Sequence, residues 1–144
     1  MFETLFVYTI LLEVGFLSSE AYNRYLDSLF AENPDNVLLL ELEWNSFNNQ
    51  KISEIMLEYC ERNIIEYSVL GKSLLKELKR IYFQGEWDIH AFASKVYELW
   101  KVLPLKIQEV EPFGVMSYAD DPLSWGDEEQ TRQLYEEMFD FYKR

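Results

Sequence analysis

Residues 85–104 read GEWDIHAFASKVYELWKVLP, and this stretch carries the start, the apolar face and the end of one helix. Gly85 is a residue type that ends helices, and Asp88 is one that caps a helix N-terminus by accepting a backbone N–H bond. Pro104 stops the pattern because its ring is incompatible with a helix interior. We therefore predict a helix from Asp88 to Pro104, with its apolar face formed by Ile89, Phe92, Val96, Leu99, Trp100 and Leu103.

The same kind of pattern recurs along most of the chain, which has only five glycines and four prolines. Ser18 is placed to cap one helix, and Asp127 with Gln130 resembles a capping box at the start of the last. Apolar stripes predict further helices over 2–14, 18–33, 51–63, 69–84 and 127–144.

The secondary structure of two segments is harder to predict from the sequence. The last five residues of Val37–Trp44 alternate like a strand, whereas Asp35 or Asn36 would cap a helix. We favour the helix, because a lone strand would have no partner elsewhere in the chain. Residues 104–126 hold three of the four prolines and two of the five glycines, so Leu105–Trp125 is predicted to be an irregular connector.

The chain has 144 residues, of which 49% are hydrophobic, enough for one packed core. The expected fold is all-α: a single helical domain over residues 1–144, a bundle of six to seven helices built from αα-hairpins. Residues 15–30 and 85–100 share the same order of features: a glycine that ends a helix, a cap residue and then an amphipathic helix. Shared cap and stop chemistry explains most of that likeness, and a true internal duplication is the alternative.

Little in the sequence points to catalysis, so we expect a protein that is not an enzyme and takes no cofactor. Cys60 is the only cysteine and His90 the only histidine, which leaves no disulfide framework and no zinc ligand set. We expect Cys60 to be a buried structural thiol and His90 a partly exposed structural residue. A carboxylate-metal hydrolase would need a motif such as Glu-x-x-His, which the sequence lacks.

The N-terminal apolar run contains Glu3 and Glu13, and no basic residue precedes it. A signal peptide needs the opposite charge pattern, and no stretch of 18 uncharged apolar residues occurs anywhere in the chain. We therefore expect a cytoplasmic protein that does not enter a membrane.

The formal net charge is −13, from 26 acidic and 13 basic residues. It is unevenly spread, with eight acids and one base in residues 1–50, and ten acids and three bases in residues 107–144. This balance argues against direct binding to nucleic acid or anionic membranes and fits a basic protein partner.

The densest acidic segment also contains aromatic residues, in residues 117–129, SYADDPLSWGDEE. Aromatic side chains ringed by carboxylates are typical of protein-binding hot spots. The candidate partner-binding residues are Tyr118, Asp120, Asp121, Trp125, Asp127, Glu128 and Glu129. As an alternative, the three acids from Asp127 on serve only the helix dipole and Trp125 plugs the core.

The chain resembles small bacterial immunity proteins, most of all those of the colicin D immunity type. The resemblance covers Lys72 to the C-terminus and is carried by overall size and charge, the Gly85–Phe92 stretch and the late acidic segment before the last helix. It implies a non-enzymatic inhibitor that binds a cognate toxin, commonly a cationic nuclease, and presents carboxylates where RNA phosphates would lie. The alternative is a helical adaptor or regulatory subunit that uses the same surface for another cytosolic protein.

Overall fold

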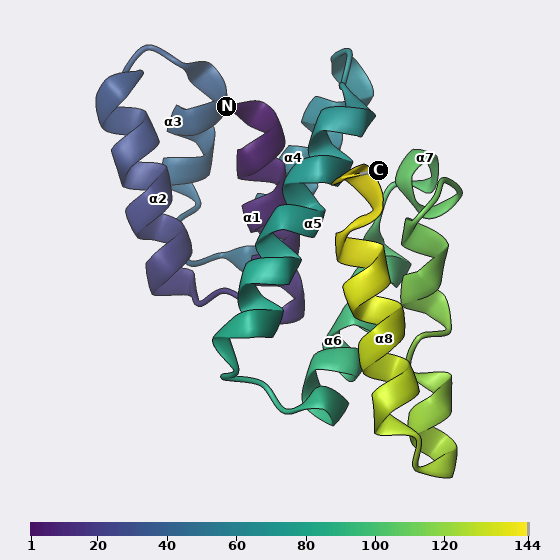
Figure 1. Cartoon of the computed structure of the whole chain (residues 1–144). Coiled ribbons are helices and arrows are strands. Elements are labelled where there is room, and N and C mark those ends of the chain that lie inside the picture. Colours follow the sequence, from purple (N-terminus) through teal and green to yellow (C-terminus); the bar gives the residue numbers. More distant parts are fainter. Residues whose placement is uncertain (144) are drawn as a thin grey trace. The chain divides into compact units, whose positions relative to one another are not determined.

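The computed structural model describes residues 1–143, and these residues form helices joined by short turns, with no strand among them (Figure 1). The predicted all-α class is confirmed. Within residues 1–143, seven α-helices have eight or more residues, and the four-residue α7 is an eighth. The α-helices are α1 (Phe2–Val14), α2 (Ser19–Glu32), α3 (Val37–Trp44), α4 (Asn49–Arg62), α5 (Tyr67–Gln84), α6 (Ile89–Val102), α7 (Leu105–Gln108) and α8 (Glu128–Phe139).

The predicted helix caps are confirmed at three helix starts. The side chains of Ser18, Asp88 and Asp127 each accept a backbone N–H bond from the residue three positions later, at 3.1, 2.8 and 3.0 Å. Each of these bonds satisfies one N–H group that the first turn of a helix would leave without a partner.

Val37–Trp44 forms helix α3, which confirms the helix that we favoured over a strand. The Asn36 side chain accepts from the Leu39 N–H at 3.1 Å and so starts the helix. Leu39 and Leu42 are fully buried, so packing of the two leucines against the rest of the structure adds to the local cap.

The prediction of an irregular connector over Leu105–Trp125 is wrong. This segment contains α7 and two 3₁₀ helices, η1 (Phe113–Ser117) and η2 (Asp121–Trp125). Proline is tolerated at the start of a helical turn, and Pro122 occupies that position in η2. Ile107, Phe113, Met116 and Ala119 are buried, which shows that apolar burial holds the segment in place.

Helices α1–α4 form a compact N-terminal unit, Met1–Glu66. Within it α1 packs against α2 and α4, and α2 packs against α3. A buried hydrogen bond of 3.0 Å joins the hydroxyls of Thr9 and Tyr22, and Thr9 also donates to the Leu5 carbonyl. Cys60, which was expected to be buried, is only half-buried, and the buried residues of α4 are Ile52, Ile55 and Met56.

The C-terminal unit, Tyr67–Arg144, contains the remaining helices. Helix α8 packs against α5, η1 and η2, while α6 packs against η1. An aromatic cluster supports α8: the ring of Tyr82 lies 5.3 Å from that of Phe92 and 5.4 Å from that of Phe139, and Phe92 lies 5.2 Å from Tyr135. The single domain over residues 1–144 stays a prediction.

Close packing in the C-terminal unit also explains a glycine inside α5. A Cβ atom on Gly71 would lie 2.8 Å from Cζ of Phe113, and Phe113 is only 1% exposed. The missing side chain of Gly71 therefore lets the first residue of η1 pack directly on α5.

No helix formed by residues 1–143 is both long enough and apolar enough to cross a membrane.

Candidate functional site

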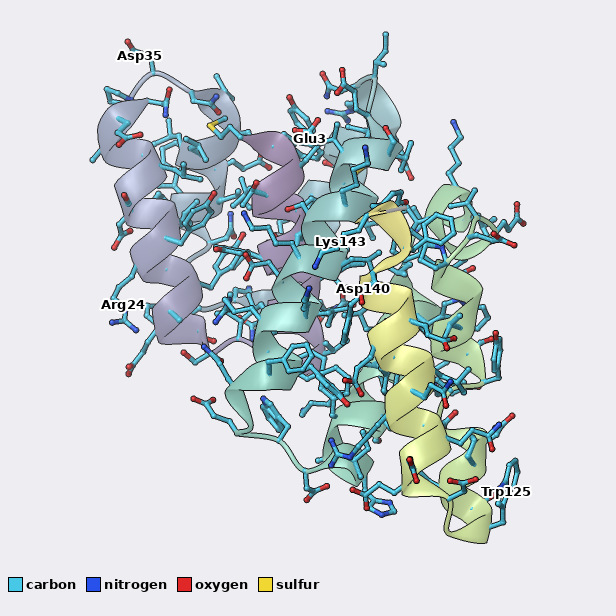
Figure 2. The ribbon with its side chains drawn as sticks, viewed as in Figure 1. Glu3, Arg24, Asp35, Trp125, Asp140 and Lys143 are labelled. Atoms are coloured by element: carbon cyan, nitrogen blue, oxygen red, sulfur yellow. The ribbon has the colours of Figure 1, made fainter. Side chains whose placement is uncertain are left out.

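The two predicted aromatic anchors are both exposed. Tyr118, which directly follows η1, is 47% exposed, and Trp125, the last residue of η2, is 64% exposed. Figure 2 shows the Trp125 side chain at the far end of the C-terminal unit, directed outward. The alternative in which Trp125 plugs the core is therefore wrong.

Two of the predicted acids serve α8 itself. Asp127 is the N-cap, and Glu128 pairs with Arg132 one turn later at 2.9 Å. These contacts match the helix-start alternative for Asp127 and Glu128. Glu129 instead lines a shallow hollow along the outer side of α8, whose other acids are Glu136, Glu137 and Asp140.

Asp120 and Asp121 have different surroundings although they are adjacent. Asp120 is half-buried, and its negative charge adds to burial in raising the pKa of the Tyr135 phenol above its ordinary value. Asp121 is exposed and begins η2. Of the pair, Asp121 is therefore the one available to a partner.

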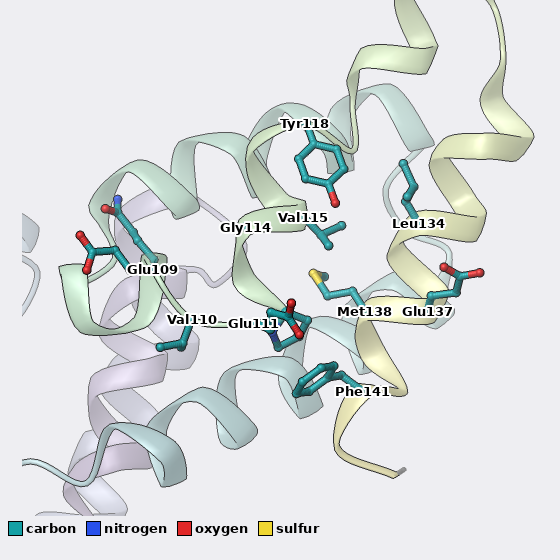
Figure 3. A pocket seen from close by; sticks show the side chains of 12 residues that line it. Glu109, Val110, Glu111, Gly114, Val115, Tyr118, Leu134, Glu137, Met138 and Phe141 are labelled. Carbon is teal, nitrogen blue, oxygen red and sulfur yellow. The ribbon is translucent and has the colours of Figure 1, made fainter.

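A groove between η1 and α8, with a volume of about 340 Å³, lies beside Tyr118 (Figure 3). We call it the η1–α8 groove. Tyr118 lies at one end and Phe141 at the other, with the side chains of Val115 and Met138 between them. Its apolar lining consists of Val110, Pro112, Val115, Leu134, Met138 and Phe141.

The rim of the η1–α8 groove is acidic. Glu109 and Glu111 approach it from the segment between α7 and η1, and Glu137 from α8. None of its lining residues, all of which belong to the described part of the chain, is basic. Exposed apolar area surrounded by charge of one sign is a feature of protein-binding surfaces.

Buried contacts hold both sides of the groove. Phe113 and Met116 of η1 are buried in the core, which leaves Gly114 and Val115 on the groove side. A buried hydrogen bond of 2.7 Å from the Thr131 hydroxyl to the Ala119 carbonyl ties α8 to the chain that follows η1. The groove is thus formed by the folded C-terminal unit and needs no rearrangement to exist.

The sequence pattern predicted Tyr118 but not the rest of the groove. Glu109, Glu111, Glu137 and Met138 lie outside residues 117–129, and the η1 segment was expected to be irregular. The sequence feature that could have indicated the groove is the triplet Glu109–Val110–Glu111, in which an apolar residue lies between two acids.

The chemistry of Cys60 and His90 does not suggest a catalytic pair. Burial, followed by the nearby Glu61 charge, raises the pKa of the Cys60 thiol to about 11, so the thiol is protonated at neutral pH. His90 is exposed in the first turn of α6, as expected. Across residues 1–143, no three His, Cys, Asp or Glu side chains are grouped so that they could hold a metal ion.

In comparisons with family models, with curated proteins and with solved structures, nothing matches this chain.

Proposed function

We propose that the C-terminal unit binds a basic protein through the η1–α8 groove and the acidic surface around it. One observation carries this proposal: an apolar groove with three carboxylates on its rim has no basic residue among its described lining residues. An apolar side chain of the partner would fill the groove, while flanking lysine or arginine side chains meet Glu109, Glu111 and Glu137.

The biological role that we propose is neutralisation of a cognate basic toxin, such as a nuclease, by a cytoplasmic immunity protein. The net charge of −13 and the resemblance to immunity proteins of the colicin D type support this role. In this role the protein acts by covering the toxin's basic surface and performs no chemistry itself. Trp125 and Asp121 would form a second contact at the far end of η2.

The test is co-expression with the protein encoded by the adjacent gene. We expect that protein to be toxic alone and harmless with this chain, and the two to form a complex that weakens as salt is raised. A harmless neighbour that still co-purifies would indicate the adaptor alternative instead. A harmless neighbour that does not bind would refute both.

A charge-neutral variant locates the surface. Replacing the three rim acids by glutamine (Glu109→Gln, Glu111→Gln, Glu137→Gln) should weaken binding by about a hundredfold or more, since each lost charge-assisted contact is worth about 1 kcal/mol or more and three sum to about 3 kcal/mol. The matched control replaces three exposed acids of α4, Glu54, Glu58 and Glu61, and changes the net charge equally. Equal loss in both variants would show that bulk charge, not the groove, governs binding.

A further inference from the structure

The N-terminal unit has a surface of its own that the function proposed above does not use. Trp44, the last residue of α3, is 79% exposed, and Phe47, in the turn before α4, is 64% exposed. A large aromatic side chain typically buries roughly 150–250 Å² in a core or interface. Two such side chains exposed to solvent on the same unit therefore indicate a surface that a partner could cover. Both line hollows that share Asp27 of α2.

Phe47 is held in a strained backbone conformation. Its φ angle is 68°, in the left-handed region that suits glycine or asparagine and costs a bulky residue roughly 1–2 kcal/mol. Backbone bonds from Ser46 to Glu43 (3.2 Å) and from Asn48 to Asn45 (3.0 Å) fix the turn on both sides. The turn thus keeps an aromatic ring exposed where a smaller residue would be more stable.

Two carboxyl groups line the hollows beside the aromatic residues. Glu43 lines the hollow beside Trp44, and Asp27 lines both that hollow and the one beside Phe47, with volumes of about 400 and 390 Å³. Burial and then the nearby Asp27 carboxyl raise the pKa of Glu43 to about 7. The Glu43 Oε1 atom is buried and has no hydrogen-bond partner among residues 1–143.

Asn23 supplies an independent sign that something polar is missing. It is 6% exposed and lines the hollow beside Phe47. Its Nδ2 donates to the Ser19 carbonyl at 2.8 Å, which fixes the orientation of the amide. Its Oδ1 is therefore an acceptor, buried and without a partner in the described part of the chain. A buried acceptor of this kind costs about 1–3 kcal/mol until a donor reaches it.

The two buried polar atoms on this surface without a hydrogen-bond partner in residues 1–143, Asn23 Oδ1 and Glu43 Oε1, are both acceptors, and the surface carries a negative charge. Glu20, Asp27 and Glu43 outnumber Arg24, the basic residue among the described lining. Figure 2 shows Arg24 extending from α2 into solvent. A guanidinium group has five donors, no acceptor and a flat face that stacks on aromatic rings, so it matches both the acceptors and the aromatic residues.

We propose that this surface, formed by α2, α3 and the turn at Phe47, docks an arginine side chain of a protein partner. Asp27 supplies the countercharge, Glu43 Oε1 and Asn23 Oδ1 accept hydrogen bonds from the guanidinium, and Trp44 and Phe47 flank the guanidinium and its neighbouring apolar residues. The inference does not depend on the η1–α8 groove, because every residue that carries it belongs to the N-terminal unit.

The test follows the backbone and indole N–H signals of the full-length protein by NMR during titration with a blocked peptide, Gly-Leu-Arg-Leu-Gly. We expect saturable shifts at Trp44, Ser46 and Phe47. The same peptide with citrulline, which keeps the shape but lacks the charge, should bind about tenfold more weakly or worse. The assignment would be overturned if the arginine peptide caused no saturable shifts. It would also be overturned if the citrulline peptide, or a third peptide with lysine in place of arginine, bound as tightly as the arginine peptide.

Variants separate the site from net charge. Asp27→Asn with Glu43→Gln should abolish the shifts, whereas Glu54→Gln with Glu58→Gln on α4 changes the charge equally and should keep them. Trp44→Ala removes a side chain that is 79% exposed, so folding is kept while the peptide affinity should fall about fivefold.

The groove variant distinguishes this inference from the proposed function. The triple glutamine variant of the η1–α8 groove should retain the peptide shifts even though it loses the basic partner. Loss of the peptide shifts in that variant would contradict a separate site in the N-terminal unit.

Discussion

Replacing Gly71 by alanine tests the packing that positions the η1–α8 groove. In an open helix position this change stabilises a protein by about 1 kcal/mol, because glycine is the poorer helix former. At Gly71 the new Cβ would lie 2.8 Å from Cζ and 3.1 Å from Cε2 of Phe113. Phe113 is only 1% exposed, so its ring cannot avoid the new Cβ by moving out toward solvent. Overpacking of a core costs about 1–3 kcal/mol, so after the helix-propensity gain is subtracted the expected net result is a loss of up to about 2 kcal/mol.

The assay is urea unfolding of the full-length protein, followed by far-ultraviolet circular dichroism and by tryptophan fluorescence. A companion variant, Phe113→Leu, removes the two ring atoms that crowd the new Cβ. In that background Gly71→Ala should no longer destabilise, so the two substitutions should couple by about 1 kcal/mol or more. Phe113→Leu alone should cost about 1–3 kcal/mol through the cavity that it leaves.

The matched control is Gly85→Ala. Gly85 has a φ of 75°, but nothing lies within 4 Å of an added Cβ, so its cost is a backbone cost of about 1 kcal/mol. That cost should be the same with Phe113 or Leu at position 113. If Gly71→Ala stabilises the protein, or if its effect is unchanged by Phe113→Leu, the contact does not limit packing and the reasoning is refuted.

Four further results are expected. Asp127→Ala should lower the free energy of unfolding by about 1 kcal/mol in urea unfolding, because it removes the α8 cap, whereas Asp127→Asn should keep most of it. Trp125→Ala should change stability by less than about 0.5 kcal/mol, since the side chain is 64% exposed, yet weaken partner binding measured by calorimetry. Native Glu43 retains a proton that the unfolded chain releases between the ordinary pKa of 4.5 and the native value of about 7, so its contribution to stability falls as pH rises through that window. Glu43→Gln should therefore stabilise the protein by about 1 kcal/mol at pH 8, allowing for solvent screening, and by nothing at pH 4; equal effects at both pH values would contradict this. Cys60 should react with a thiol reagent at pH 8 about a hundredfold more slowly than after denaturation, because its pKa is about 11; equal rates would contradict the protonated, half-buried thiol.

The helix starts were predictable because their chemistry is local. Ser18, Asp88 and Asp127 each act on a residue three positions away, so a short window of sequence contains all the information. For Val37–Trp44, whose last five residues alternate like a strand, the helix was favoured because a lone strand would have no partner, and the structure adds a local cap from Asn36.

The segment Leu105–Trp125 was mispredicted because its order depends on distant residues. Prolines and glycines there suggest an irregular chain, but Phe113 becomes buried only because Gly71 in α5 leaves it room. A contact between residues 42 positions apart leaves no periodic trace in the sequence.

The candidate site was predictable only in its composition. The acidic and aromatic character of residues 117–129 gave the exposed Tyr118, Asp121 and Trp125, whereas Asp127 and Glu128 turned out to be engaged within α8. The η1–α8 groove required the fold, since Glu109, Glu111 and Glu137 approach it from two separate segments.

The side of the groove opposite α8 is built from short 3₁₀ turns, and this has a consequence for how the protein can diversify. Gly114 in η1 has no heavy atom within 4 Å of the place where a Cβ would stand, and the turn is fixed from behind by Phe113 and Met116. New side chains at this position can therefore alter the shape and charge of the groove while the packing of α5, α6 and α8 stays intact. A partner that changes its surface can be followed by one or two substitutions in η1, at little cost to the stability of the unit.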